Sequence, residues 1–442
     1  MADIMQKLLY SLSFIILFFT SCMASSGTKS VTDDNRQEVS SSVVSSDHGA
    51  LNKPVLDSAY FGNTASGLND FSLRLALETR KRFTDMENYI ISPLGVAVDL
   101  AMTIPGAAGK TREEILDVLG HLREETLDSL DRLLSLVYYN LNHPAVPGSS
   151  SLHTSFWINK GFKVKKSFIE SCTDDFDASV YVRKLSSIET MNEINRWVEV
   201  RTNGLIKQLL DDPLNEVQMT ALLNTIYVKG KWDKAFDTKN TRKEKFHNLN
   251  GTDGECDMMQ LNDEGFDVVR FDKFNIIRFP LDSTRYGLDI VYPHPGVSLG
   301  ECLPQLDGEI FTDWDKKAIR VSWNIIKMPK WEIETKLFFS GPLINIGVKQ
   351  LFDVDADLSG ITDVKPFYVD EILQKAKFIV DEQGAEAAAA TIEIMIGGMD
   401  FEGRRHEPSK LILDRPFMYI LTDTRTNTII FIGEIRNFQQ AS

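Results

Sequence analysis

The chain has 442 residues, of which 43% are hydrophobic and 25% are charged, so it is long enough to bury a large core. Its formal net charge is −15, from 63 acidic against 48 basic residues. Nucleic acids and heparin-like polyanions bind dense faces of Lys and Arg, so this balance argues against either as the main partner.

The first 22 residues are predicted to be a secretory signal, outside the fold. Lys7 supplies a positive charge, and the apolar run 8–19 is shorter than the ~20 residues that span a bilayer. Two cleavage patterns fit. Cys22 and Ala24 satisfy the small-x-small rule of ordinary signal peptidase, whereas residues 19–22 resemble a bacterial lipoprotein box in which Cys22 is lipidated. Both predict an extracytoplasmic protein, either secreted or lipid-anchored at the cell surface.

Residues 23–66 are rich in Ser, Asp, Gly and Asn without sustained periodicity, which predicts a flexible tether. One continuous domain is predicted over 67–442. Beyond Cys22 the chain has only Cys172, Cys256 and Cys302, so we expect no disulfide framework. No Cys or His cluster suggests a metal site, and we expect no cofactor.

Helical patterns come early in the domain. Apolar residues at 68, 71 and 75, and again at 191, 194 and 198, recur with helical spacing, and the second stripe stops at Asn203 and Gly204. Residues 111–114, Thr-Arg-Glu-Glu, form a capping-box pattern that predicts a helix start at Thr111 and an end at Gly120.

Strand patterns dominate later. Residues 221–229 are nearly all apolar or β-branched, as in a strand covered on both faces. Runs 411–421 and 428–435 are β-rich and separated by a polar turn at 423–427. Helices first and long strands afterwards predict an α+β fold.

The segment 382–391 does not fit this pattern. Its alanine run has helix propensity, yet it follows the strand-like residues 377–381 without a cap. Residues 391–396 are β-like again, and a polar stretch follows. A loop of this length between strands is uncommon unless it is functional, although a short surface helix is the plainer interpretation.

This segment resembles the hinge of the reactive loop in inhibitory members of the serpin family. The matching residues are Glu382, Gly384, Ala385, Glu386, Ala387, Ala388, Ala389, Ala390 and Thr391. Other family-like motifs occur in the family's order across about 67–438: Ile91-Ser92-Pro93, Gly106-Ala107, Asn195 with Trp197, Asn224, Gly230 with Trp232, Met328-Pro329-Lys330, Asp357-Leu358-Ser359-Gly360, Asp414-Arg415-Pro416-Phe417 and Gly433.

The resemblance implies three β-sheets, eight to nine helices and an exposed reactive loop at about 382–410. It also implies a suicide substrate: a serine or papain-like cysteine protease attacks the loop, and the cut loop inserts into the central sheet with the protease attached. Side chains alternate along a strand, so Ala385, Ala387, Ala389 and Thr391 would share the inward face. Glu386 would point outward, and Gly384 would allow the turn into the loop.

Other roles follow from the same resemblance. Glu382 and Lys330 would pair as a latch where the sheet first opens, beside Trp232. Ser92 and Asn224 would lie beneath the middle of the sheet, where hydrogen bonds exchange as the strands part. Gly95 and Gln374 depart from the Ser and His that the family usually has there. Glu393 departs as well, because it would be buried on insertion and so slow insertion or make it pH-sensitive.

The family's count from Glu382 puts the scissile bond between Gly398 and Met399, with Arg404 and Arg405 as the alternative. Six more residues of slack would lengthen the tether by roughly 20 Å, which favours cleavage within 396–399. Such bait suits elastase-like, subtilisin-like or papain-like proteases, bound by a monomeric inhibitor. A non-inhibitory serpin, acting as carrier or chaperone, is the second interpretation, although its hinge usually carries Pro, charged or bulky residues. We expect no enzyme, because no nucleophile elbow, P-loop or metalloprotease motif is present in the sequence.

Overall fold

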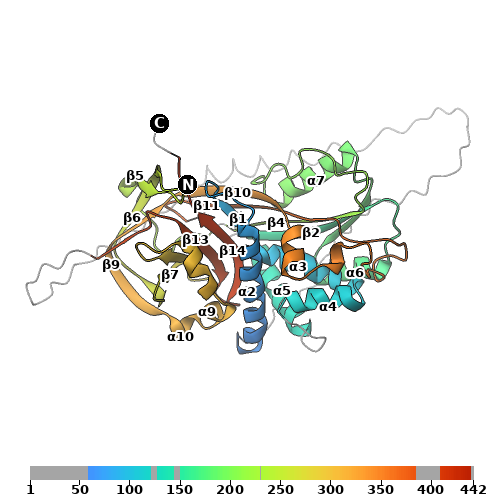
Figure 1. Cartoon of the computed structure of the whole chain (residues 1–442), viewed down its shortest axis with the longest axis horizontal. Helices are drawn as coiled ribbons and strands as arrows, with labels where there is room; N and C mark the ends of the chain where they lie inside the picture. Colours follow the sequence, from blue (N-terminus) through green and yellow to red (C-terminus); the bar gives the residue numbers. More distant parts are fainter. Residues whose placement is uncertain (1–57, 121–126, 144–149, 229, 385–408, 440–442) are drawn as a thin grey trace, which may run out of the picture. The chain divides into compact units, whose positions relative to one another are not determined.

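The computed structural model describes residues 58–120, 127–143, 150–228, 230–384 and 409–439 (Figure 1). No helix in these ranges is long and apolar enough to cross a membrane. The α-helices are α2 (Ser58–Arg80), α3 (Pro93–Thr103), α4 (Gly109–Val118), α5 (Leu127–Asn142), α6 (Lys166–Phe176), α7 (Ile188–Arg201), α8 (Leu299–Cys302), α9 (Gly308–Thr312), α10 (Trp314–Lys317) and α11 (Ser340–Ile346).

The strands of the described residues form two sheets. The five-stranded sheet has the order β10 (Trp331–Phe338), β11 (Ile372–Val380), β4 (Thr220–Val228), β2 (Ser150–Asn159) and β3 (Ser179–Arg183). The larger sheet has the order β1 (Tyr89–Ile91), β14 (Thr428–Ile435), β13 (Phe417–Asp423), β8 (Tyr286–Pro293), β7 (Phe274–Leu281), β6 (Asp253–Arg270), β9 (Ile319–Pro329) and β12 (Lys410–Ile412), with β5 (Arg242–His247) beside β6.

The α+β prediction is confirmed, but three separate sheets are not seen over the described residues. The long strands β6 and β9 pair with each other from Met258 to Val268, and β6 also pairs with β5 at one end and β7 at the other. Two of the three sheets that we expected therefore share these strands and form one continuous hydrogen-bonded sheet. The helix count also exceeds eight to nine in this part of the chain, because α8, α9 and α10 are single short turns.

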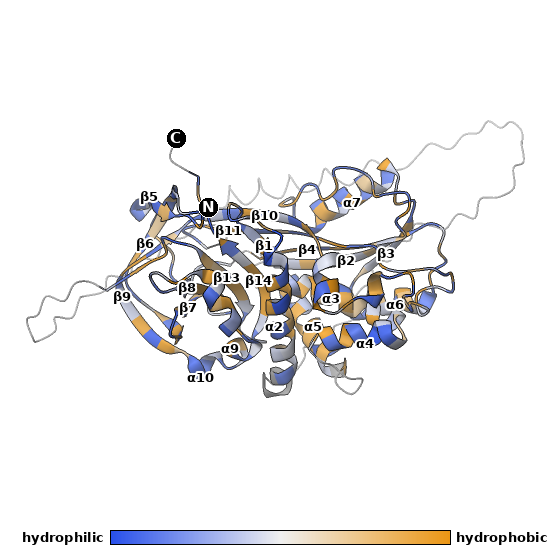
Figure 2. Ribbon diagram, viewed as in Figure 1, coloured by the Kyte–Doolittle hydropathy of each residue, from blue (hydrophilic) through white to orange (hydrophobic). Residues whose placement is uncertain are grey.

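Helix α3 lies between the two sheets and is buried along its whole length. It contacts β2, β4 and β11 on one side and β14 on the other. The opposite face of the five-stranded sheet is covered by α7, as Figure 1 shows. Figure 2 shows α4 and α6 as alternating hydrophilic and hydrophobic segments, as expected for helices with one buried face.

The helix predictions hold for α2 and α7 and fail in detail for α4. The apolar stripe of α2 is fully buried, and α7 ends where Asn203 and Gly204 adopt positive φ. Helix α2 begins at Ser58, so the boundary that we placed at residue 67 falls inside it. Helix α4 begins at Gly109, not Thr111: the Thr111 hydroxyl accepts the Asp357 amide at 2.9 Å and so ties the helix to a distant loop instead of capping it.

The predicted strand at 221–229 is β4, and every residue of it is buried because sheet neighbours, α3 and the α7 layer surround it. The run 411–421 is split into β12 and β13, since Pro416 lacks an amide hydrogen for the ladder. The turn before β14 is confirmed, with Asn427 at a φ of 53°.

Candidate functional site: the seam between two central strands

The candidate site is the junction of β11 and β4, here called the seam. These neighbours run parallel, with Ile372 opposite Leu222 and Ala376 opposite Ile226. Their pairing stops at Ala376, yet β11 continues to Val380 and stays paired with β10. Over the described residues, the seam is therefore closed along its first half and unpaired towards the end from which the chain leaves β11.

A tight turn reverses the chain directly after β11. The amide of Asp381 donates to the carbonyl of Gly384 at 3.0 Å, and the amide of Gly384 donates back to Asp381 at 3.3 Å. Gly384 also pairs antiparallel with Lys231, beyond the end of β4. After the turn, Gly384 therefore lies between Asp381, which follows β11, and Lys231, which follows β4.

Only glycine fits at position 384. Its φ is +109°, and an added Cβ would lie 2.2 Å from the carbonyl oxygen of Gly230. The predicted role of Gly384 in the turn is therefore supported by its backbone conformation and by the space around it. The other hinge residues that we named, 385–391, lie outside the described residues, as do Glu393, Gly398, Met399, Arg404, Arg405 and Cys22.

An ion pair joins Lys330 and Glu382 at this end of the seam, and its role as a latch stays a prediction. Lys330 Nζ lies 2.7 Å from Glu382 Oε2, and the Glu382 side chain is 8% exposed against 36% for Lys330. Thr241 donates to the other carboxylate oxygen at 2.7 Å. Burial by itself would raise the pKa of Glu382, but the hydrogen bonds from Lys330 and Thr241 outweigh it and hold this pKa below its ordinary value.

Trp232 supports the turn from beneath. Its indole Nε1 donates to the carbonyl of Asp381 at 2.7 Å, and its amide donates to Gln383 at 3.2 Å. The ring packs edge-on against Phe236, whose amide donates to the carbonyl of Glu382 at 2.8 Å. Trp232 therefore fixes the backbone on which the latch depends.

A hydrogen-bonded group that we call the shutter network lies beneath the middle of the seam. Gln374 of β11 donates to Asn224 of β4 at 2.8 Å, across the seam. The same amide group accepts from the backbone of Ser92 at 2.7 Å and donates to its carbonyl at 2.9 Å. Ser92 caps α3 and donates to Ile430 of β14 at 2.8 Å, so the seam is tied to both α3 and the larger sheet.

The two departures from the family pattern in this network lie next to each other. A Cβ on Gly95 would lie 2.6 Å from Asn224 Oδ1 and 3.0 Å from Gln374 Nε2. A serine at 95 would therefore clash with the amides as they now lie. The longer glutamine occupies space that the missing side chain leaves free.

Sequence reasoning missed Asp99, the one ionisable residue of α3. Its carboxylate accepts from Asn224 Nδ2 and from the Thr154 hydroxyl of β2, and it is fully buried. Burial raises the pKa of Asp99 to about 7, although both hydrogen bonds act to lower it. A single carboxylate inside the apolar run 93–103 was the available signal, because a buried charge needs polar partners.

The outer face of the seam is covered. Leu223 and Leu373 pack against α7 and the segment that follows it. Lys375 donates to the carbonyl of Gln208 in that segment at 2.6 Å and pairs with Glu334 at 2.7 Å. Any strand that enters the seam must therefore loosen this cover.

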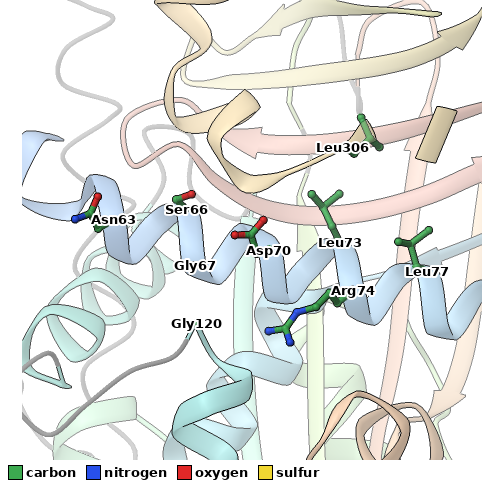
Figure 3. Close-up of a pocket in the computed structure, with 9 residues that line it drawn as sticks. All are labelled: Asn63, Ser66, Gly67, Asp70, Leu73, Arg74, Leu77, Gly120 and Leu306. Carbon is green, nitrogen blue, oxygen red and sulfur yellow. The ribbon is translucent and has the colours of Figure 1, made fainter. Parts of the chain in front are cut away.

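A cavity of about 450 Å³ lies against α2, away from the seam strands (Figure 3). Its charged groups already hold neighbouring backbone. Asp70 accepts from the amide of Gly308 at 2.7 Å, and Arg74 donates to the carbonyl of Val118 at 2.7 Å. Both charged groups therefore hold backbone around this cavity.

Comparison with known proteins identifies the family. A family model described as serpin (serine protease inhibitor) matches residues 66–438. The chain belongs to the serpin family. This serpin is 28% identical to Serpin-Z10 of Arabidopsis thaliana over 85% of the chain and 98% of that protein, and 30% identical to an uncharacterised serpin-like protein of Methanosarcina mazei over 86% and 88%.

Solved structures agree. The thermophilic serpin tengpin in its native state aligns with a TM-score of 0.72 and 25% identity, over 88% of this serpin and 96% of that chain. Human thyroxine-binding globulin in complex with thyroxine aligns with a TM-score of 0.75 and 22% identity, over 86% and 100%. The second likeness shows the fold alone, and most members of the family are protease inhibitors.

Proposed function

We propose that this serpin is a suicide-substrate inhibitor that takes its cleaved reactive loop into the seam as a new strand. The observation that carries the proposal is Gly384, which already pairs with Asp381 on one side and Lys231 on the other. A strand continued from Gly384 would run antiparallel to both β11 and β4. Two antiparallel ladders would then replace one short parallel ladder, whose pairing is slightly weaker per residue.

Extending the Gly384 register gives each loop residue its neighbours in the inserted state. Ala385, Ala387 and Ala389 would lie opposite residues 380, 378 and 376 of β11, which face the core. Small side chains fit such an inner strand and lose little entropy on burial. Each new backbone hydrogen bond would add about 1 kcal/mol net.

Thr391 would fall between Gln374 and Asn224 in this register. Insertion must break the hydrogen bond between these two side-chain amides. Without a new partner, both amides would then be left unpaired at a buried position. A threonine hydroxyl both donates and accepts, so it can take the place of that bond. This accounts for a polar residue at the one inward position that meets polar partners.

The target is a serine or papain-like cysteine protease cutting within 396–399, with Gly398–Met399 as the scissile bond. Elastase-like and subtilisin-like enzymes suit the small and apolar side chains there. Cleavage after Arg404 or Arg405 would instead indicate a trypsin-like target. The secretory signal predicted over residues 1–22 favours an extracytoplasmic location. The inhibitor would be either a secreted monomer or a monomer anchored through a lipid on Cys22.

The fold alone does not distinguish a protease inhibitor from a carrier protein, because thyroxine-binding globulin has the same fold. The alanine-rich hinge and the seam favour inhibition. The test is incubation with a panel of proteases of these classes, followed by denaturing gels and intact-mass analysis. We expect a covalent complex whose mass is the sum of the protease and the chain without the peptide released from its loop. Cleavage with no complex for any protease would contradict the proposal and favour a carrier.

A further inference from the structure

We propose that Asp99 is the positioning residue of the seam: its carboxyl group orients Asn224 in the closed seam, and its ionisation favours parting of β4 from β11. The inference deepens the proposed function and rests on it, since parting of these strands matters for inhibition only if the loop inserts there.

The argument begins with the donor pattern. Asn224 donates to Asp99 through its amide nitrogen Nδ2, a bond that a carboxyl oxygen can accept whether or not the group is protonated. That bond turns Oδ1 of Asn224 towards β11, where Gln374 Nε2 donates to it at 2.8 Å. Asp99 therefore fixes, through one intermediate residue, the side-chain bond across the seam.

The same contacts make Asp99 sensitive to opening. It is fully buried, and burial is the main cause that raises its pKa. When the strands part, the bond between Asn224 and Gln374 breaks and water reaches the Asn224 side of the carboxylate. Hydration restores an ordinary aspartate, which releases its proton more readily. The open seam consequently holds fewer protons than the closed one, and by linkage a rise in pH favours opening.

No other titratable group in this part of the chain faces Asp99. His153 of β2 and Lys375 of β11 are each one position from Thr154 and Gln374, so strand alternation points them to the opposite face of the sheet. Lys377 shares the outward face with Lys375 and pairs with Glu332. The charged groups on β14, α6 and α2 are bonded elsewhere or lie on outer faces: Glu434, Lys166, Glu170, Asp174, Asp175, Asp70, Arg74, Glu78 and Arg80.

The remaining titratable group of α6 is Cys172, a buried thiol. Burial raises its pKa to about 12, so it stays neutral across the range where Asp99 titrates. Asp99 is therefore the group of this layer that changes charge near neutral pH.

The magnitude follows from the two states. With a closed-state pKa of about 7 and an ordinary value in the open state, the opening constant rises with pH up to about 7 and then levels off. Between pH 6 and pH 8 it should rise about tenfold. Above pH 8 little further change is expected from this residue.

Amide hydrogen exchange of the intact chain, read by mass spectrometry, measures this opening without any protease. Protection of peptides covering 220–228 and 372–380, corrected for the intrinsic exchange rate, should fall about tenfold from pH 6 to pH 8. Strands β13 and β14 are the internal control, because global unfolding would expose them equally. A flat profile at the seam, or an equal change in β13 and β14, would overturn the role of Asp99.

Asp99→Asn is the matched variant. Asparagine keeps an oxygen for Asn224 and offers its NH₂ to the Thr154 hydroxyl, but it cannot titrate. Its seam protection should be independent of pH between 6 and 8, and a retained tenfold change would overturn the proposal.

Thr154→Val gives a second test if Asp99→Asn does not fold. It removes a hydrogen bond that lowers the pKa of Asp99, so the midpoint should move to higher pH. An unmoved midpoint would contradict the proposal.

The failure of this inference and the failure of the proposed function can be told apart. Exchange is measured on uncleaved protein, so seam protection that does not change with pH would refute the role of Asp99 and leave the inhibitor proposal standing. If seam protection depends on pH but no protease forms a covalent complex, the role of Asp99 would stand and the inhibitor proposal would fail.

Discussion

Breaking the latch should make the seam easier to open. Lys330→Ala removes the ion pair to Glu382 and leaves a largely buried carboxylate with Thr241 as its side-chain partner. Exposed ion pairs contribute about 0–1 kcal/mol, and breaking a fully buried pair costs about 3–5 kcal/mol. For this half-buried pair we expect a loss of about 1–2 kcal/mol, a factor of roughly 5–30 in the opening equilibrium.

The assay is the rate at which the intact protein takes up a synthetic peptide with the sequence of residues 385–396, followed on native gels. Lys330→Ala should take it up roughly 5–30 times faster than the unmodified chain. Lys327→Ala is the control, since it breaks a partly buried pair with Glu244 that does not touch β11. Equal rates for Lys330→Ala and the unmodified chain, or equal acceleration in the control, would refute the latch.

Further predictions concern the turn, the shutter network and the loop. Because the folded pKa of Glu382 lies below 4.5, its contribution is complete above pH 4.5 and is lost as the pH falls through the folded value. Below pH 4.5 the uptake rate of the latch variant, divided by that of the unmodified chain, should therefore fall towards one, because both chains share the opposing response of Asp99; a constant ratio would contradict this. Gly384→Ala should destabilise the protein by about 1–3 kcal/mol, so an unchanged melting temperature would count against the strained turn. Gly95→Ser should be destabilising alone and less so with Gln374→His, with a coupling of at least about 0.5 kcal/mol; strictly additive effects in denaturant melts would show that the two departures are independent. Glu393→Ala should raise the fraction of protease trapped as complex, because the inserted register puts Glu393 between buried Ile372 and Leu222. An unchanged inhibition ratio would dismiss Glu393 as a brake.

The local sequence pattern correctly predicted elements whose environment is the same along their length. Strand β4 is apolar throughout because both its faces are covered, and α7 ends where Asn203 and Gly204 take positive φ. Pattern failed where a distant contact decides the local structure. Thr111 looked like a cap but bonds Asp357, a contact between residues far apart in the sequence.

The candidate site was predicted less completely than the fold. Resemblance assigned Lys330, Glu382, Ser92 and Asn224. The first two form an ion pair and the last two lie in the shutter network, while their roles in opening stay predictions. It could not assign Asp99, because its role depends on Asn224 and Thr154 meeting it from two strands. The pairing of Gly384 with both Asp381 and Lys231 could not be predicted from the sequence either, since it depends on where the end of β4 lies.

The central claim is that a cut loop becomes a strand of the five-stranded sheet. The most direct measurement compares thermal unfolding, followed by circular dichroism, of the intact chain and of the same chain cut once within 396–399. Several new hydrogen bonds at about 1 kcal/mol each should raise the melting temperature by at least about 10 °C in the cut protein. A cut chain that melts no higher than the intact one would contradict insertion into the seam.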